Sequence, residues 1–400
     1  MSANKLEILK SEVESELCQN ILPFWINKMI DRENGGFYGR IEGNGTIHAD
    51  ADKGCVLNAR ILWTFSSAYR ILKNPDYLKI AEISRDYLLE YFFDTKHGGV
   101  YWLLDNIGDV RDGKKQIYAQ AFAIYGLVEY FRATNDRKCL EKAIDLFKLI
   151  ERYSYDEKLD GYFEAFTMEW GQLDDLRLSA KDANEKKTMN THLHVLEAYT
   201  NLYRVWKDDF LKQQLRRLIV VFTDKIVNNQ SNNLSMFFDE EWNDKTDLVS
   251  YGHNIESSWL LYEAALVLGD EPIISKVKKL SVLIADSSKD GIMKDGSMIY
   301  EKFSSSGHID FDRHWWVQAE AVVGFLNAYN LSGNEEYLNL SLAAWKFISE
   351  HLIDRQNGEW FWSVDNDMKQ NNKDDKAGFW KCPYHNSRMC MEIIERNYVV

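Results

Sequence analysis

The chain has 400 residues, of which 45% are hydrophobic, and it carries a formal net charge of −14. The hydrophobic content is enough for a large buried core, which excludes a disordered chain. The acidic balance disfavours nucleic acid and anionic membranes as partners, because both recruit clustered Lys and Arg, and it favours a neutral ligand over an anionic one.

Helical periodicity runs along the whole chain, and the expected helices fall into two alternating sets. In chain order, they cover residues 6–29, 53–72, 76–93, 116–134, 136–153, 188–206, 208–228, 252–269, 271–287, 314–331, 335–353 and 384–396. The set that starts at 6–29 is amphipathic; in 138–153, Leu140, Ile144, Phe147 and Ile150 form one apolar stripe. The other set is apolar nearly all round, as in 120–131, which is typical of buried helices.

A Gly- or Asp-rich turn followed by aromatic residues recurs between these helices. Aligning Gly36, Gly99, Gly161, Ser235, Gly296 and Gly358 gives steps of 63, 62, 74, 61 and 62 residues. A period of this size indicates a repeat architecture. Six buried and six half-buried helices in alternation predict an all-α fold, an (α/α)6 barrel of six inner and six outer helices in one domain over 1–400. The alternative is a helical solenoid, whose two helix sets need not differ so much in burial.

The N-terminus and the cysteines indicate the compartment. The stretch MSANKLEILKSEVESELC lacks the apolar region of a secretory signal, and no apolar run approaches the roughly 20 residues of a membrane helix. The odd number of cysteines and the lack of CxxC spacing predict reduced thiols, with no disulfide framework and no zinc site. We therefore expect a cytoplasmic protein. The five are Cys18, Cys55, Cys139, Cys382 and Cys390.

Polar and aromatic residues interrupt the first turns of every helix in the buried set. A lone buried histidine is usually a satisfied core group, and aromatic residues mostly fill core. Six repeats that place such residues at the same helix end predict one shared pocket. The candidates are Arg60; Tyr118, Gln120 and Phe122; Asn190, His192 and His194; His253, Glu256 and Trp259; Trp315, Trp316 and Glu320; and Trp380, His385 and Arg388.

Spacing within these turns suggests some pairs and excludes others. His253 and Glu256 are three residues apart on one helix face and can touch, and a carboxylate beside an imidazole orients the ring and raises its pKa. His192 and His194 are two apart and point to different faces, which argues against a helical two-histidine metal site. GxxxxGK[ST], a strand-linked GxGxxG and GxSxG are all absent. We expect neither a metal nor a cofactor.

At these residues the sequence resembles the N-acylglucosamine 2-epimerase superfamily, and within it the cellobiose 2-epimerases. The resemblance runs from NILPFW (20–25) and ENGGFYG (33–39) through SYGHNIESSWL and WWVQAEAVVGF to WKCPYHNSRMC (380–390). It implies an (α/α)6 barrel that needs no cofactor. It also implies inversion at C2 of the reducing-end glucose of a β-1,4-linked disaccharide such as cellobiose, mannobiose or lactose.

The resemblance also implies roles for single residues. His253 and His385 match the two acid–base histidines, Arg60 the essential arginine and His194 a third histidine, while Glu256 and Glu320 match carboxylates of the family's site. The positions that match sugar contacts are Trp316, Trp380, Tyr118, Phe122, Asp182 and Asn190; Trp259 joins this substrate-binding set through its place in the same turns. His192 receives no role.

The chemistry expected of these residues is proton transfer. One of His253 and His385 takes the C2 proton, Arg60 stabilises the resulting cis-enediolate, and the other histidine returns a proton to the opposite face. We expect one imidazole to be charged and the other neutral at the start. Three alternatives stay open: an aldose–ketose isomerase on the same fold, an (α/α)6 glycoside hydrolase using a pair such as Glu256 and Glu320, and a non-catalytic sugar-binding protein. We expect a monomer.

Overall fold

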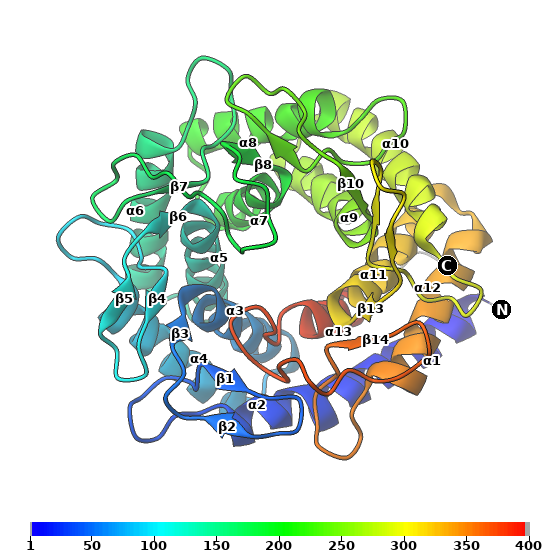
Figure 1. Cartoon of the computed structure of the whole chain (residues 1–400), viewed down its shortest axis with the longest axis horizontal. Helices are drawn as coiled ribbons and strands as arrows, with labels where there is room; N and C mark the ends of the chain where they lie inside the picture. Colours follow the sequence, from blue (N-terminus) through cyan, green and yellow to red (C-terminus); the bar gives the residue numbers. More distant parts are fainter. Residues whose placement is uncertain (1, 397–400) are drawn as a thin grey trace.

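Two concentric rings of helices surround one axis in the computed structural model, which describes residues 2–396 (Figure 1). The inner ring contains α3 (Cys55–Leu72), α5 (Ile117–Thr134), α7 (Met189–Val205), α9 (Tyr251–Leu268), α11 (Trp315–Ser332) and α13 (His385–Glu395). The outer ring contains α1 (Ser2–Glu16) with α2 (Leu22–Lys28), then α4 (Pro75–Tyr87), α6 (Arg137–Tyr153), α8 (Asp209–Val221), α10 (Glu271–Ser287) and α12 (Glu335–Phe347). The expected (α/α)6 barrel and its alternation of helices are confirmed.

Short turns carry the chain from each inner helix to the next outer helix. Several inner helices end at a residue with positive φ, such as Asn135 (φ 64°) or Gly269 (φ 74°). The next residue caps the outer helix: Asp136 accepts a hydrogen bond from the Lys138 N–H, and Asp270 accepts one from the Ile273 N–H. A left-handed residue followed directly by an Asp or Asn cap reverses the chain in few residues, which sets the two helices antiparallel.

The ring closes through the N-terminal helices, which pack beside α12 and α13. Three indole N–H groups donate to carboxylates across this junction: Trp345 to Glu12 (2.7 Å), Trp360 to Glu16 (2.8 Å) and Trp25 to Glu359 (3.1 Å). Because the first and last repeats are in contact, the fold is a closed barrel and not a solenoid.

Short antiparallel strands lie just before the inner helices and join neighbouring repeats. Apart from the β1–β2 hairpin, each sheet pairs residues that directly precede an inner helix with residues that follow an aromatic turn. The paired sets are β1 (Arg40–Ile41) with β2 (Ile47–His48); β3 (Lys53–Gly54) with β4 (Leu103–Leu104) and β5 (Val110–Asp112); β6 (Lys115–Gln116) with β7 (Ala165–Phe166); β8 (Lys187–Thr188) with β9 (Phe237–Phe238); β10 (Leu248–Ser250) with β11 (Glu301–Phe303) and β12 (Ile309–Asp310); and β13 (Arg313–His314) with β14 (Ser363–Val364).

A polar side chain at the fourth position of an inner helix fastens each of several aromatic turns. The Gln120 amide accepts from the Val100 N–H (2.8 Å) and donates to the Val100 carbonyl (2.9 Å). In the same helical position, Gln318 accepts from Met298, Asn254 accepts from Leu234, and His192 accepts through Nε2 from the Tyr162 N–H at 2.8 Å. His192 therefore has a structural role, which the sequence did not reveal: it satisfies a buried backbone donor.

These bonds also correct the alignment of the turns. The β-bridges Phe93 to Val100, Tyr155 to Tyr162, Val227 to Leu234, Ile292 to Met298 and Ile353 to Trp360 mark equivalent positions. The residues that match Gly99 and Gly161 are thus Asn233, Ser297 and Glu359, and not Ser235, Gly296 and Gly358. The alignment relied on glycine to mark the residues with positive φ in these turns. Asn232 and Glu359 adopt positive φ without being glycine, so the alignment was wrong there.

A buried ion pair locks most of the turns to the strand before the next inner helix. Lys53 pairs with Asp31 (2.8 Å), Lys115 with Asp94 (2.8 Å), Lys187 with Asp156 (2.6 Å) and Lys376 with Asp354 (2.6 Å). In the fourth repeat, the sequence position that corresponds to these lysines is Val249, and Asn228 stands in place of the aspartate. The turn beside α9 therefore lacks this lock.

Among the described residues, no helix is long and apolar enough to cross a lipid bilayer.

The neutral state of His192 predicts a measurable effect of pH on stability. Burial lowers the pKa of His192 to about 4, whereas an imidazole in an unfolded chain has a pKa of about 6.5. Below pH 6.5 the unfolded chain therefore takes up a proton that the folded protein does not, and the free energy of unfolding falls. His192→Gln keeps the acceptor for Tyr162, as at Gln120. We expect the loss of unfolding free energy between pH 7 and pH 5 to shrink by about 2 kcal/mol.

Urea unfolding at the two pH values measures this change. His308→Gln is the matched control, because His308 is exposed, and it should leave the pH dependence as in the wild type. An unchanged slope in His192→Gln would contradict a neutral, buried imidazole at this position.

Candidate active site

The site is built from one repeated position of the inner helices. The sixth residues of α3, α5, α7, α9 and α11 are Arg60, Phe122, His194, Glu256 and Glu320. Equivalent positions in equivalent helices lie at one level of the barrel axis, and His385 joins them from the start of α13. The expectation that six repeats supply one shared site agrees with this arrangement.

Arg60 is a buried guanidinium held by aromatic and neutral groups. Its Nη2 donates to the Tyr118 hydroxyl (2.8 Å) and its Nη1 to the Cys382 thiol (3.5 Å), and it lies over the rings of Phe122 (4.1 Å) and Tyr384 (4.7 Å). Its Nε has no hydrogen-bond partner. Among residues 2–396, no carboxylate lies within ion-pair distance of Arg60. A buried cation without a counter-charge is costly, which makes it a receptor for a negative charge that appears during a reaction.

His194 lies beside Arg60, with its ring against Tyr118 and Phe122 (centroids at 4.9 and 4.7 Å). Its Nδ1 is 3.0 Å from a carboxylate oxygen of Glu197. Burial lowers the pKa of His194 to about 4, and the neighbouring guanidiniums add to this effect against Glu197. The imidazole is therefore neutral near pH 7.

His253 and His385 contact the same indole, that of Trp316, with ring centroids at 4.8 and 5.5 Å. The hydrogen-bond partner of His253 Nδ1 is the Ser250 hydroxyl at 2.8 Å. The expected contact between His253 and Glu256 is wrong, because Glu256 is bound to Arg388 instead.

The expected pKa values of these two histidines are corrected as well. Burial lowers the pKa of His253 to about 3, and burial together with Arg60 and Arg388 holds the pKa of His385 well below its usual value. Neither imidazole carries a raised pKa, so both are neutral in the free protein and neither starts charged.

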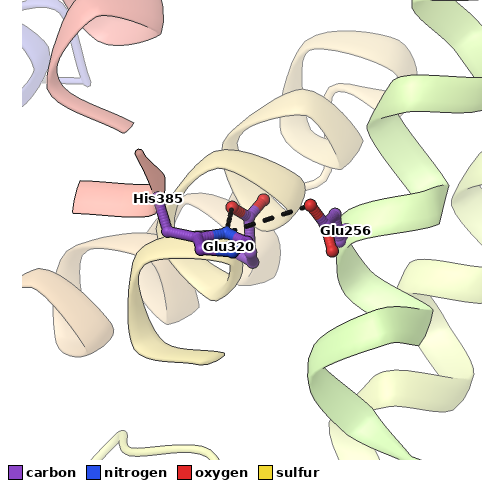
Figure 2. A group of neighbouring side chains, drawn as sticks. All are labelled: Glu256, Glu320 and His385. Carbon is purple, nitrogen blue, oxygen red and sulfur yellow. Dashed lines mark hydrogen bonds and ion pairs between the residues drawn. The ribbon is translucent and has the colours of Figure 1, made fainter. Parts of the chain in front are cut away.

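Glu256 and Glu320 face His385 from α9 and α11, as Figure 2 shows. His385 Nδ1 is 2.8 Å from Glu320 and 3.9 Å from Glu256. The guanidinium of Arg388 joins the group, with Nη2 2.5 Å from Glu256 and 2.6 Å from Glu320. Burial and the neighbouring Glu320 raise the pKa of Glu256 to about 8, and burial raises that of Glu320. Two carboxylates thus share one cation and hold a proton with unusual strength.

The same three side chains have the composition of a metal site. One ligand atom from each of Glu256, Glu320 and His385 lies within 4.8 Å of the others. However, Arg388 already binds both carboxylates, and its fixed positive charge would repel a second cation at this place. The trio therefore does not fit a metal ion, and we assign none to it.

The remaining candidates lie in different surroundings. Trp259 is 1% exposed, and its indole N–H donates to Glu320 (3.0 Å), so it helps to hold that carboxylate in place. Trp380 is half-buried beside Tyr118, and Asn190 is half-buried with an unpartnered side-chain oxygen. Asp182 lies outside the helices, where it accepts from the Ser179 N–H (2.9 Å), and burial raises its pKa.

Four groups that bear on the site were not among the residues selected from the sequence: Glu197, Ser250, Cys382 and Tyr384. Glu197 follows His194 by three residues, the spacing that was used to pair His253 with Glu256, so a signal for it existed. Ser250 precedes His253 by three residues, so its contact is local as well. The contacts of Cys382 with Arg60 and of Tyr384 with Glu197 depend on segments brought together by the fold, and no local pattern marks them.

A cavity of about 380 Å³ opens at the opposite end of the barrel, where the inner helices finish. Arg70, Arg132 and Arg204 occupy one repeated position there, and they pair with Glu129, Glu263 and Glu395. Basic side chains in the last turn favour the negative end of each helix dipole. Glu197 lines this cavity as well, so the floor of the candidate site is one layer of side chains thick.

Residues 36–388 match the N-acylglucosamine 2-epimerase (GlcNAc 2-epimerase) family. A cellobiose 2-epimerase of Bacteroides fragilis is 54% identical over 388 residues, which cover 97% of this chain and 99% of that relative. The chain belongs to the N-acylglucosamine 2-epimerase family. It is therefore a carbohydrate epimerase, an isomerase.

Solved structures agree with this family. The cellobiose 2-epimerase of Bacillus thermoamylovorans superposes with a TM-score of 0.94 at 44% identity, over 98% of this chain and 100% of that chain. The crystal structure of a D-mannose isomerase superposes with a TM-score of 0.84 at 21% identity, over 96% of this chain and 97% of that chain. At that level the likeness supports the shared fold.

The shared cation predicts that Arg388 is essential for folding stability. Arg388→Met would leave Glu197, Glu256 and Glu320 buried together without a counter-charge. We expect a loss of about 3–5 kcal/mol in the free energy of unfolding, measured by urea denaturation at pH 7. Arg177→Met removes an exposed pair with Asp175 and should stay close to wild-type stability. Equal stability of the two variants would show that Arg388 does not hold the carboxylates.

Proposed function

We propose that this epimerase inverts C2 of the reducing-end glucose of a β-1,4-linked disaccharide, with cellobiose converted to 4-O-β-glucosyl-mannose. The observation that carries the proposal is the buried Arg60 guanidinium, with no carboxylate at ion-pair distance among residues 2–396, together with two imidazoles that contact one indole. Full-length relatives that are cellobiose 2-epimerases support the substrate class. The net charge of −14 suits a neutral sugar.

The reaction begins with ring opening, because C2 becomes acidic only when C1 is an aldehyde. A neutral imidazole, His253 or His385, then takes the C2 proton, and the electron pair moves onto the C1 oxygen to give a cis-enediolate. Arg60, which is buried, neutralises that oxygen. Both imidazoles are neutral in the free protein, so either one is ready to act as the base.

Inversion requires a proton from the opposite face. The second imidazole must be protonated when it donates to C2, and the enediolate between the two rings supplies the negative charge that raises its pKa. This proton originates in solvent and not in the substrate. Trp316 lies against both rings and fixes their separation. Trp380, Tyr118, Phe122, Asn190 and Asp182 are the proposed sugar contacts, with Glu320 and Glu256 as supports of His385.

Two alternatives fit the site less well. A mannose-type isomerase needs one base that moves a proton between C2 and C1, whereas here two imidazoles contact the same indole, that of Trp316. A glycoside hydrolase needs two carboxyl groups free to flank a glycosidic bond. Glu256 and Glu320 instead bind one Arg388 nitrogen.

We also propose that residues 1–400 form one catalytic domain that works as a monomer in the cytoplasm. The five cysteines are all unpaired, which suits a reducing compartment. Every proposed site residue comes from this one chain, so a single barrel suffices.

Product analysis tests the activity. Incubation with cellobiose should yield 4-O-β-glucosyl-mannose, identified by chromatography, and in deuterated water the mannose should carry deuterium at C2. A ketose product would support the isomerase, and free glucose the hydrolase. Epimer without deuterium would argue against two solvent-linked bases.

Single substitutions test the assigned residues. His253→Ala, His385→Ala and Arg60→Met should each lower kcat at least ~10³-fold, because each removes a proton-transfer group or the charge that stabilises the enediolate. Circular dichroism should show intact helices in the histidine variants. His308→Ala, at an exposed position, should keep wild-type kcat. Near-normal turnover in either active-site histidine variant would refute the two-base scheme.

A further inference from the structure

Glu197 is a buried carboxylate that joins the two halves of the candidate site. It lies on α7, three residues after His194, and is 4% exposed. It accepts hydrogen bonds from His194 Nδ1 (3.0 Å), from Arg388 Nη1 (2.5 Å) and from the Tyr384 hydroxyl. Glu197 thus has three partners, which come from two helices and a loop. The proposed reaction gives this side chain no role.

The bond to Glu197 dictates the tautomer of His194. Burial alone would raise the pKa of Glu197, but Arg388, His194 and Tyr384 hold it at about 2, so the group is ionised. An ionised carboxylate only accepts hydrogen bonds, so His194 Nδ1 must carry the hydrogen. In a neutral imidazole Nε2 then bears the lone pair. Among the described residues, Nε2 has no hydrogen-bond partner.

Positive charge surrounds His194 from the neighbouring elements. Arg60 on α3 and Arg388 on α13 both lower its pKa, and His253 and His385 interact with it electrostatically. Glu197 is the negative group that faces it. Without Glu197, nothing would favour a hydrogen on Nδ1 over one on Nε2.

The contacts continue beyond His194. Arg388, which binds Glu197, also donates to Glu320 (2.6 Å), and Glu320 in turn binds His385 Nδ1 (2.8 Å). Glu197 therefore also helps to place the guanidinium that orients the carboxylate behind the second imidazole. A change at Glu197 reaches both histidines through side chains that are in direct contact.

We propose that Glu197 is a positioning residue that holds His194 as the Nδ1–H tautomer, so that Nε2 serves ring opening of the sugar. This inference rests on the proposed function. Nε2 accepts the hydrogen of the C1 hydroxyl as the C1–O5 bond breaks. It then passes that hydrogen to O5, so that the sugar opens with no net change of charge. An Nε2–H tautomer could not accept it.

Glu197→Gln tests the proposal, because a glutamine amide can donate to Nδ1 and thereby permits the other tautomer. The matched control is Glu129→Gln on α5. Glu129 is also buried (1% exposed) and ionised, and it binds Arg70 (2.7 Å), Arg132 (2.7 Å) and Asn201 (3.1 Å), with no histidine among these partners. Both variants remove one buried charge, so a merely structural role predicts equal effects.

We expect kcat of Glu197→Gln to fall ~100-fold with KM changed less than ~3-fold, in line with the loss of one general acid–base group. Glu129→Gln should keep kcat within ~3-fold. Urea unfolding of both variants separates lost stability from lost catalysis. Equal loss of activity in the two variants, or full activity in Glu197→Gln, would overturn the proposal.

A second measurement does not depend on turnover. Nitrogen-15 NMR of histidine-labelled free protein distinguishes the two tautomers, and His194→Gln assigns the signal by its loss. The wild type should show neutral His194 with hydrogen on Nδ1, and Glu197→Gln should show hydrogen on Nε2. Hydrogen on Nε2 in the wild type would refute the inference. Because no sugar is present, this result is independent of whether cellobiose is the substrate, which product analysis of the wild type decides.

Discussion

One buried cation organises the reactive end of this barrel. Arg388 binds Glu197, Glu256 and Glu320 at once, and those carboxylates in turn orient His194, His385 and the Trp259 indole. The cost of burying three carboxylates is offset only if the guanidinium stays in place. A rigid, closed ring of helices meets that condition, since α7, α9, α11 and α13 are each fixed by neighbours on both sides. Catalytic geometry and folding stability therefore depend on the same contacts.

Much of the fold could be predicted because the spacing of apolar residues along each helix indicates which of its faces are buried. Inner helices such as 120–131 are apolar all round, and outer helices such as 138–153 have one apolar stripe. The inner helices can therefore be assigned as fully buried and the outer helices as buried on one side before any contact is known. The Glu197 bond to His194 follows the same short-range logic. The partner of Glu256 does not: spacing allows His253, but Arg388, 132 residues further on, binds that carboxylate. Long-range competition of this kind has no signature in a single helix.

The protonation states show the same limit. A pattern of histidine near glutamate suggests a raised imidazole pKa, whereas in the assembled site the imidazoles are buried near two guanidiniums, so that burial and positive charge lower it. The carboxylates move the other way, and Glu256 reaches a pKa of about 8. The two proposed bases, His253 and His385, are therefore unprotonated across the neutral range, and in the proposed reaction the charge of the intermediate must raise the pKa of the one that donates a proton.

The missing lock beside α9 has a consequence for how the repeats have diverged. In four other repeats a buried lysine binds an aspartate of the turn, and in the fifth Arg313 lies 3.6 Å from Asp295. At Val249 and Asn228 this ion pair is absent, and the adjacent Ser250 binds His253. The repeat without this ion pair carries one of the two proposed bases, His253, whereas the other, His385, follows the segment that keeps the Lys376–Asp354 pair. Because the barrel consists of six similar repeats, one repeat can lose a stabilising ion pair beside a reactive group while the ion pairs of the other repeats keep the ring in place.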